Sequence, residues 1–151
     1  MKQYAFILLN IEKFWNRLCS QNQAGKVNHA FVRRGNVGPK LAQKLFFYVI
    51  SPQKKIQGYA DFVDHITGNA DVLWKQYGHE SLLNTYDEYK DFLQGRDKAT
   101  FIRFTNLKQL PMPISAKKIS EIVGVSQMPQ MGIYITQETA QQLLEAGGAQ
   151  L

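Results

Sequence analysis

The chain has 151 residues, of which 44% are hydrophobic and 20% are charged, so it is long enough to bury a core and typical of a globular protein. Its net charge of +6 and isoelectric point of about 9.4 favour an anionic partner. The single cysteine, Cys19, excludes an intramolecular disulfide, and the apolar runs are too short to span a bilayer. Without an apolar leader, a cytoplasmic protein that does not contact membranes is expected.

Charge is distributed unevenly along the chain. No Asp or Glu lies between Glu12 and Asp61, and we refer to this interval as the basic window. Its basic residues are Lys13, Arg17, Lys26, Arg33, Arg34, Lys40, Lys44, Lys54 and Lys55. Isolated lysines are usually only solvated, but a stretch with one sign of charge attracts polyanions. The window therefore predicts a surface that binds a polyanion.

The first elements are predicted to be a strand and a helix. Residues 3–9 are apolar enough for a strand that is buried on both faces. Asn10 is then expected to cap an amphipathic helix. Its apolar face consists of Ile11, Phe14, Trp15, Leu18 and Cys19. The helix is predicted to end in the polar loop before Gly25.

Three strands are predicted inside or just after the basic window. Residues 26–34 alternate with period two, and residues 45–50 form a fully apolar run typical of a central strand. Residues 51–55 form a turn, and residues 56–64 alternate again. This spacing favours an antiparallel pair between the last two strands.

An acidic segment from Asp61 to Asp97 follows, with eight acidic residues and three basic ones. Residues 69–77 indicate a short helix. Thr85 and Glu88 form a capping box that opens a second helix, which Gly95 ends. We expect a helical insertion at about residues 66–95 that leaves the sheet.

The remaining chain is predicted to return to the sheet and then end in a helix. Residues 98–106 form a strand, and residues 107–112 form an edge segment limited by Pro111 and Pro113. A short helix at 115–123 ends at Gly124, a brief strand follows at 132–135, and Thr136 caps a final helix. This order predicts one domain over residues 1–151, of α+β class, with a small curled β-barrel and peripheral helices.

With these elements in this order, the chain resembles the PUA-like superfamily, particularly ASCH and related archaeal-type members. The resemblance covers roughly residues 3–145. It rests on Gly25-Lys26, Arg33-Arg34-Gly35, Phe46-Phe47-Tyr48-Val49, Ile56-Gln57-Gly58-Tyr59-Ala60, the stretch from Gly95 to Ile102, and Leu110-Pro111 with Pro113-Ile114-Ser115. It implies RNA binding, and some relatives bind modified bases.

A minority of such domains are small amidohydrolases that act on acetylated cytidine with Lys, Thr and Glu. Lys26 matches the position of that lysine. However, no Thr follows it closely, and Asn28, His29 and Phe31 stand where many members carry an acid. The missing carboxylate favours a binding module over an enzyme.

Candidate nucleic-acid-binding residues combine cationic and aromatic side chains. Guanidinium groups match phosphate bidentately, and tyrosines between cations provide stacking surfaces for unpaired bases. Because adjacent strand residues point to opposite faces, only one of the two neighbouring arginines can line a given cleft. The candidates are Lys26, His29, Arg33, Arg34, Lys40, Tyr48, Lys54, Lys55 and Tyr59.

The leading hypothesis is an RNA-binding module that holds phosphates on the basic window and a base in a cleft beside the first helix and the Arg33 strand. One alternative is an amidohydrolase of a modified nucleoside, which requires a carboxylate and a hydroxyl within hydrogen-bond reach of Lys26. The other is a protein-interaction adaptor that uses the acidic segment. His29, His65 and His79 lack metal-ligand spacing, so neither a metal nor a cofactor is expected. The RNA and the oligomeric state stay open.

Overall fold

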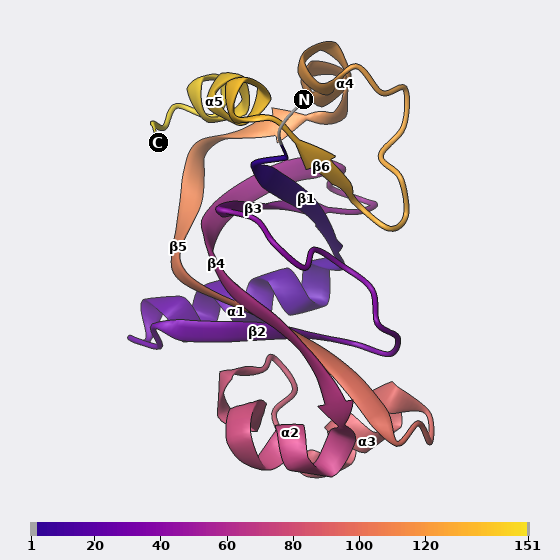
Figure 1. Cartoon of the computed structure of the whole chain (residues 1–151). Coiled ribbons are helices and arrows are strands. Elements are labelled where there is room, and N and C mark those ends of the chain that lie inside the picture. The colour runs from indigo at the N-terminus through magenta and orange to yellow at the C-terminus, as the bar shows by residue number, and fades with distance from the viewer. Residues whose placement is uncertain (1–2, 151) are drawn as a thin grey trace.

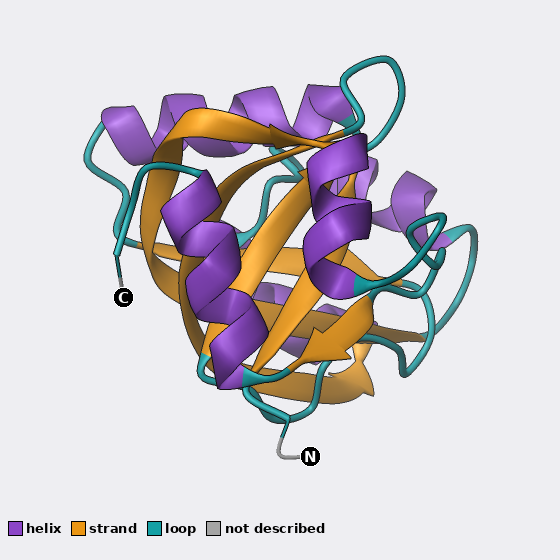
Figure 2. Cartoon of the chain, turned by 90° about the horizontal axis from the view of Figure 1, so that it is seen from above, coloured by secondary structure: helices purple, strands orange, loops and turns teal. Residues whose placement is uncertain are grey.

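Figure 1 shows a computed structural model of the chain, which describes residues 3–150. The strands are β1 (Ala5–Asn10), β2 (Asn28–Arg33), β3 (Lys44–Val49), β4 (Lys55–Asn69), β5 (Lys98–Ser115) and β6 (Ile133–Ile135). They form one sheet in the order β2-β5-β4-β3-β1-β6. The predicted α+β class is confirmed. Figure 2 shows that the sheet is curled, but β2 and β6 remain as its two edges, so a closed barrel is not confirmed.

The helices lie around this sheet, as Figure 1 shows. They are α1 (Glu12–Gln23), α2 (Ala70–Tyr77), α3 (Tyr86–Leu93), α4 (Ala116–Val123) and α5 (Gln137–Ala146), with a 3₁₀ turn at Gly78–Glu80. α4 and α5 lie near one end of the long β4–β5 pair, and α2 and α3 lie near the other. None of the helices in residues 3–150 is both long and apolar enough to cross a membrane.

The apolar run in β3 is buried because both of its faces are covered. Phe46 and Phe47 are both completely buried but belong to different clusters. Phe47 packs in the cluster that contains Trp15 of α1, whereas Phe46 packs in the one that contains Leu143 of α5. Successive strand residues point to opposite faces, so a strand between two layers needs apolar residues at every position.

The pairing of β3 with β4 is irregular next to Tyr48. β3 runs parallel to β1 and antiparallel to β4, and its register with β4 shifts between Phe47 and Tyr48. Such bulges re-aim side chains and are frequent beside functional sites. Phe47 lies in the core, whereas Tyr48 is only partly buried. Tyr48 therefore reaches the surface, although Val49 after it is completely buried.

The predicted cap at Asn10 is wrong. Asn10 is the last residue of β1, opposite Val49 of β3, and Ile11 occupies the N-cap position of α1 without a side-chain hydrogen bond. The parallel pairing of β1 with β3 keeps Asn10 in the sheet, which overrides its local capping preference. α1 also continues to Gln23, beyond the apolar face that predicted it.

The strand and edge segment predicted after residue 98 are one continuous strand. β5 runs to Ser115 and includes both Pro111 and Pro113. β2 pairs with β5 over Thr100–Thr105, so the second half of β5 has a neighbouring strand on the β4 side alone. The predicted edge character is confirmed there, since proline is tolerated where the strand has a free side.

The helical segment between β4 and β5 begins later than expected, because β4 continues to Asn69. Asn69 then caps α2 by accepting a hydrogen bond from the Val72 N–H. Thr85 caps α3 as predicted, with its hydroxyl 3.1 Å from the Glu88 nitrogen. The Glu88 carboxylate instead accepts the Asn84 N–H and a bidentate pair of hydrogen bonds from Arg17 in α1.

Candidate functional site

In the folded chain, acidic side chains from outside the basic window form ion pairs with two of its basic residues. Arg17 pairs with Glu88 of α3, and Lys44 pairs with Asp61 of β4. Both carboxylates come from the acidic segment, which folds back onto the window. Among residues 3–150, no ion pair involves the side chains of Arg33, Arg34, Lys40, Lys54 or Lys55. The free positive charge is therefore confined to part of the window.

Lys26 is held by the protein itself. Its Nζ donates to Gln21 Oε1 at 2.9 Å and to the Ser81 carbonyl at 3.2 Å. Burial lowers its pKa, and the nearby charge of Glu80 raises it. Within the described part of the chain, neither a carboxylate nor a hydroxyl hydrogen-bonds Lys26, so the arrangement that the amidohydrolase alternative requires is absent there.

Two of the candidate residues lie in the interior. His29 is completely buried, with Nε2 3.1 Å from Asn22 Oδ1 and its ring stacked on Phe104. Burial and, secondarily, the charge of Lys26 lower the pKa of His29 to about 4, so it is neutral at neutral pH. Tyr59 is 7% exposed and stacks on Phe46 in the core. Neither side chain is placed to receive a base from solution.

The neighbouring arginines diverge, as expected for adjacent residues. Arg34 is exposed, donates Nε to the Phe92 carbonyl at 2.6 Å and lies over the Phe92 ring. Arg33 points the other way, into a cavity. Lys40, on the loop that follows, is exposed, and its backbone N–H donates to the Tyr134 hydroxyl. Lys55 is also exposed, at the start of β4.

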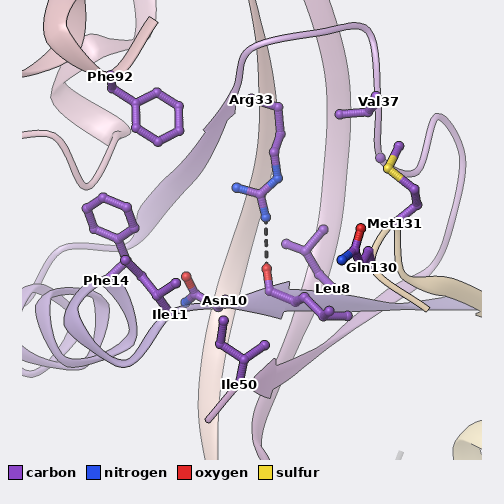
Figure 3. Close-up of a pocket in the computed structure, with 12 residues that line it drawn as sticks. Leu8, Asn10, Ile11, Phe14, Arg33, Val37, Ile50, Phe92, Gln130 and Met131 are labelled. Atoms are coloured by element: carbon purple, nitrogen blue, oxygen red, sulfur yellow. Dashed lines mark hydrogen bonds between the residues drawn. The ribbon is translucent and has the colours of Figure 1, made fainter. Parts of the chain in front are cut away.

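The cavity at Arg33 has a volume of about 440 Å³, and we refer to it as the apolar cavity. It lies where β1 ends and α1 begins, with the loop after β2 on one side and the loop that leads into β6 on another (Figure 3). Most of its wall is hydrophobic. The apolar side chains include Leu8, Ile11, Phe14, Ile50, Phe92 and Met131.

Two polar groups of the apolar cavity lack full hydrogen bonding. The Arg33 guanidinium donates Nη2 to the Leu9 carbonyl at 3.0 Å (Figure 3) and Nη1 to its neighbour's carbonyl at 3.2 Å. Burial lowers the pKa of Arg33 to about 10, so the group stays charged at neutral pH. Asn10 is 5% exposed, and its Nδ2 has no hydrogen-bond partner in residues 3–150.

A second cavity, of about 400 Å³, lies between the end of β3, the turn after it, α4 and the loop after α4. We refer to it as the polar cavity. Hydroxyl and ammonium groups line it together with some apolar side chains, and the described residues of its wall include no carboxylate or imidazole. Its polar side chains are Tyr48, Ser51, Lys54, Ser120, Ser126 and Gln127.

Tyr48 and Lys54 have unusual properties for surface residues. Burial raises the pKa of Tyr48, so its hydroxyl stays protonated and can donate a hydrogen bond. Lys54 has φ of 53°, in the left-handed region that lysine seldom adopts. Such backbone strain concentrates at functional sites. Lys54 lies in the turn between β3 and β4, which borders the polar cavity.

The two cavities adjoin each other. Leu9 and Ile50 line both, and the segment from Ser126 to Met131 runs along first one and then the other. Lys26 is distant from both cavities. The apolar cavity lies at the beginning of α1, whereas Lys26 follows the end of this helix, which has 12 residues and is about 18 Å long. Tyr48 and Lys54 thus line the same cavity, the polar one, and Arg33 lines the adjoining apolar cavity. Lys26 lines neither of them.

Sequence reasoning missed Ser126 and Asn10. Ser126 lies in a loop of mixed polar and apolar residues with no periodic pattern, and no neighbour in sequence indicates a partner. The sequence around Asn10 predicts a helix cap. The only local signal was its position between a buried strand and a helix, which fits a strand end as well as a cap.

The comparison with protein families identifies the chain. The family model described as "Domain of unknown function (DUF365)" matches residues 9–127. This match covers most of the chain, so the protein belongs to that family.

Relatives with assigned names share the fold. A curated protein of Zymomonas mobilis subsp. mobilis named "ASCH domain-containing ribonuclease" is 28% identical over 130 residues, which are 86% of this chain and 86% of that protein. Crystal structures of ASCH from Zymomonas mobilis match with a TM-score of 0.76 and 24% identity over 95% of this chain and 96% of the other. One further structure has a serine replaced by alanine (TM-score 0.76), and another has a tyrosine replaced by phenylalanine (TM-score 0.77). The predicted resemblance to ASCH and PUA-like domains is confirmed.

Proposed function

We propose that this member of the DUF365 family binds RNA and cleaves its backbone in the polar cavity. The observation that carries the proposal is that Tyr48, Lys54 and Ser126 line one surface cavity. All three groups are donors, and hydrogen bonds between such donors and phosphate oxygens are among the strongest in proteins when one partner is charged. An RNA phosphate matches this set.

The comparisons support cleavage rather than binding alone. The curated relative carries the name ribonuclease. Two solved structures of ASCH from the same species carry substitutions of a serine and of a tyrosine. Those are the residue types that accompany Lys54 here.

The chemistry that fits these groups is attack by the RNA's own 2′-hydroxyl. The bond from the 2′-oxygen to phosphorus forms, and the bond from phosphorus to the 5′-oxygen breaks. Lys54 and Ser126 hold the non-bridging oxygens, where negative charge accumulates in the transition state. Tyr48 gives its proton to the departing 5′-oxygen and regains one from solvent, while water takes the proton of the 2′-hydroxyl. The products are a 2′,3′-cyclic phosphate and a free 5′-hydroxyl.

The two other functions considered from the sequence have less support. An amidohydrolase would need a carboxylate and a hydroxyl on Lys26, and its Nζ instead contacts a glutamine side chain and a backbone carbonyl. An adaptor would need a free acidic surface. Several carboxylates of the acidic segment are instead engaged within the chain, notably Glu80 and Asp64 on Arg103 and Glu88 on Arg17.

The proposal predicts that each cleavage depends on one 2′-hydroxyl. End-labelled RNA is incubated with the protein and its cleavage positions are mapped. The same RNA is then prepared with a single 2′-deoxynucleotide on the 5′ side of the strongest position. We expect cleavage to disappear at that position only, and the remaining products to end in a 2′,3′-cyclic phosphate. Cleavage at an unchanged rate would mean that water or a protein side chain attacks phosphorus, contrary to this mechanism.

A further inference from the structure

We infer that the apolar cavity is a subsite for the RNA base next to the cleaved phosphate, and that it prefers guanine and uracil to adenine and cytosine. This inference rests on the proposed function, because it places the phosphate in the polar cavity. It adds a site and a specificity that the ribonuclease activity alone does not imply.

The wall favours a base over a phosphate. The rings of Phe14 and Phe92 lie edge to face with centroids 6.2 Å apart, and both line the cavity. Aliphatic side chains cover most of the remaining wall, including Leu8, Ile50 and the exposed Met131. A base gains by stacking on aromatic groups and by leaving water, whereas a phosphate would lose its hydration against apolar atoms. A volume of about 440 Å³ is in the range of small-molecule sites.

The Arg33 guanidinium is a hydrogen-bond donor of the cavity with capacity left. It binds only two backbone carbonyls, and no carboxylate in residues 3–150 pairs with it. Figure 3 shows the guanidinium directed from β2 toward the end of β1, inside the cavity. A guanidinium has five N–H donors, so a ligand that supplies acceptors is stabilised here.

The guanidinium selects among the bases. Guanine offers O6 and N7 as adjacent acceptors, and arginine commonly binds that edge. Uracil offers carbonyl oxygens as well. Adenine and cytosine carry an exocyclic amino group at the corresponding position, which would meet Arg33 donor against donor. We therefore expect carbonyl-bearing bases to bind better, by about 10-fold for one such contact.

The position of the apolar cavity determines which nucleotide of the RNA strand places its base there. Leu9 and Ile50 separate the apolar cavity from the polar one and line both. A strand whose phosphate contacts Lys54 can therefore place the adjoining base beyond Ile50, against Phe14. The loop from Ser126 to Met131 borders both cavities and so contacts phosphate and base together.

The test uses short DNA strands that contain one ribonucleotide, so that only one phosphate can be cleaved. The four bases are placed in turn at the ribonucleotide and, in a second series, at the nucleotide after it. Single-turnover rates are measured for each strand. At one of these two positions, guanine and uracil should be cleaved about 10-fold faster than adenine and cytosine. Rates within about twofold at both positions would overturn the inference and leave the proposed function intact.

One variant connects the preference with the cavity. Met131→Trp fills the cavity from a residue that is 63% exposed and so does not disturb the core. It should bring the ratio between the bases close to one. Met112→Trp is the matched control, since Met112 is 56% exposed and lines neither cavity. An unchanged ratio in Met131→Trp would contradict the subsite.

The same strands separate failure of the inference from failure of the proposed function. If the wild-type protein cleaves neither these strands nor the end-labelled RNA, cleavage is refuted, and the base preference is then measured by equilibrium binding. Tighter binding of guanine and uracil strands, abolished by Met131→Trp, would still support the subsite. Equal binding of all four bases would refute it.

Discussion

Replacing Lys54 by Met should lower the rate of RNA cleavage at least about 100-fold. Loss of one preorganised donor to transition-state charge typically has an effect of this size, and Lys54 supplies the only side-chain cation among the described residues that line the polar cavity. Methionine keeps most of the aliphatic stem, so the change removes the ammonium rather than packing. The measurement is the single-turnover rate at saturating enzyme, which separates chemistry from binding.

Lys55→Met is the matched control for this prediction. Lys55 is the next residue, equally basic and also exposed, but it does not line the polar cavity. Its replacement should weaken binding slightly, in line with loss of one phosphate contact, and leave the rate at saturation unchanged. Equal losses in the two variants would show that general positive charge, rather than placement in the cavity, accounts for activity.

Replacing Arg103 by Met should lower the free energy of unfolding by about 3–5 kcal/mol, the usual cost of leaving a buried charge without its partner. Arg103 Nε and Nη2 bind the two oxygens of Glu80 at 2.9 and 3.1 Å, and Nη1 binds Asp64 at 2.9 Å. The Glu80 side chain is only 6% exposed. The Arg103 guanidinium also lies over the Tyr77 ring, 4.3 Å from its centroid. Arg103 therefore connects β5 with the helical segment between β4 and β5. Urea unfolding followed by circular dichroism measures the loss.

A second substitution tests whether the unpaired charge is the cause. In the Arg103→Met background, Glu80→Gln removes the buried negative charge and should recover part of the stability. Arg96→Met is the control, because Arg96 is exposed and its Nη1 donates only to the Arg34 carbonyl. It should change stability by no more than about 0.5 kcal/mol. If Glu80→Gln recovered nothing, lost packing would explain the effect of Arg103→Met.

The sequence predicted those parts of the fold that depend on neighbouring residues. Thr85 and Thr136 cap their helices through hydroxyls that accept hydrogen bonds from residues three positions later. Gly124 ends α4 with φ of +85°, a conformation in which glycine has no steric penalty. Phe46 and Phe47 were correctly placed in a central strand. Each of these signals lies within a few residues of the structure that it determines.

Features that depend on distant residues could not be predicted in this way. Asn10 has the chemistry of a cap, but its pairing with Val49 places it in β1. Arg17 belongs to a stretch without acids, and Glu88 pairs with it only because α3 packs near α1. The polar cavity joins Tyr48 and Lys54, which the sequence selected for charge and stacking, to Ser126, which only the fold brings near.

The central claim is that RNA binds in the polar cavity rather than beside Lys26. The most direct test is to titrate the isotope-labelled protein with an RNA made uncleavable by 2′-O-methyl groups and to follow its backbone amide resonances by NMR. The account predicts the largest shifts at Tyr48, Ile50, Lys54 and Ser126, with little change at Lys26. Large shifts around Lys26 and none at Lys54 would contradict it.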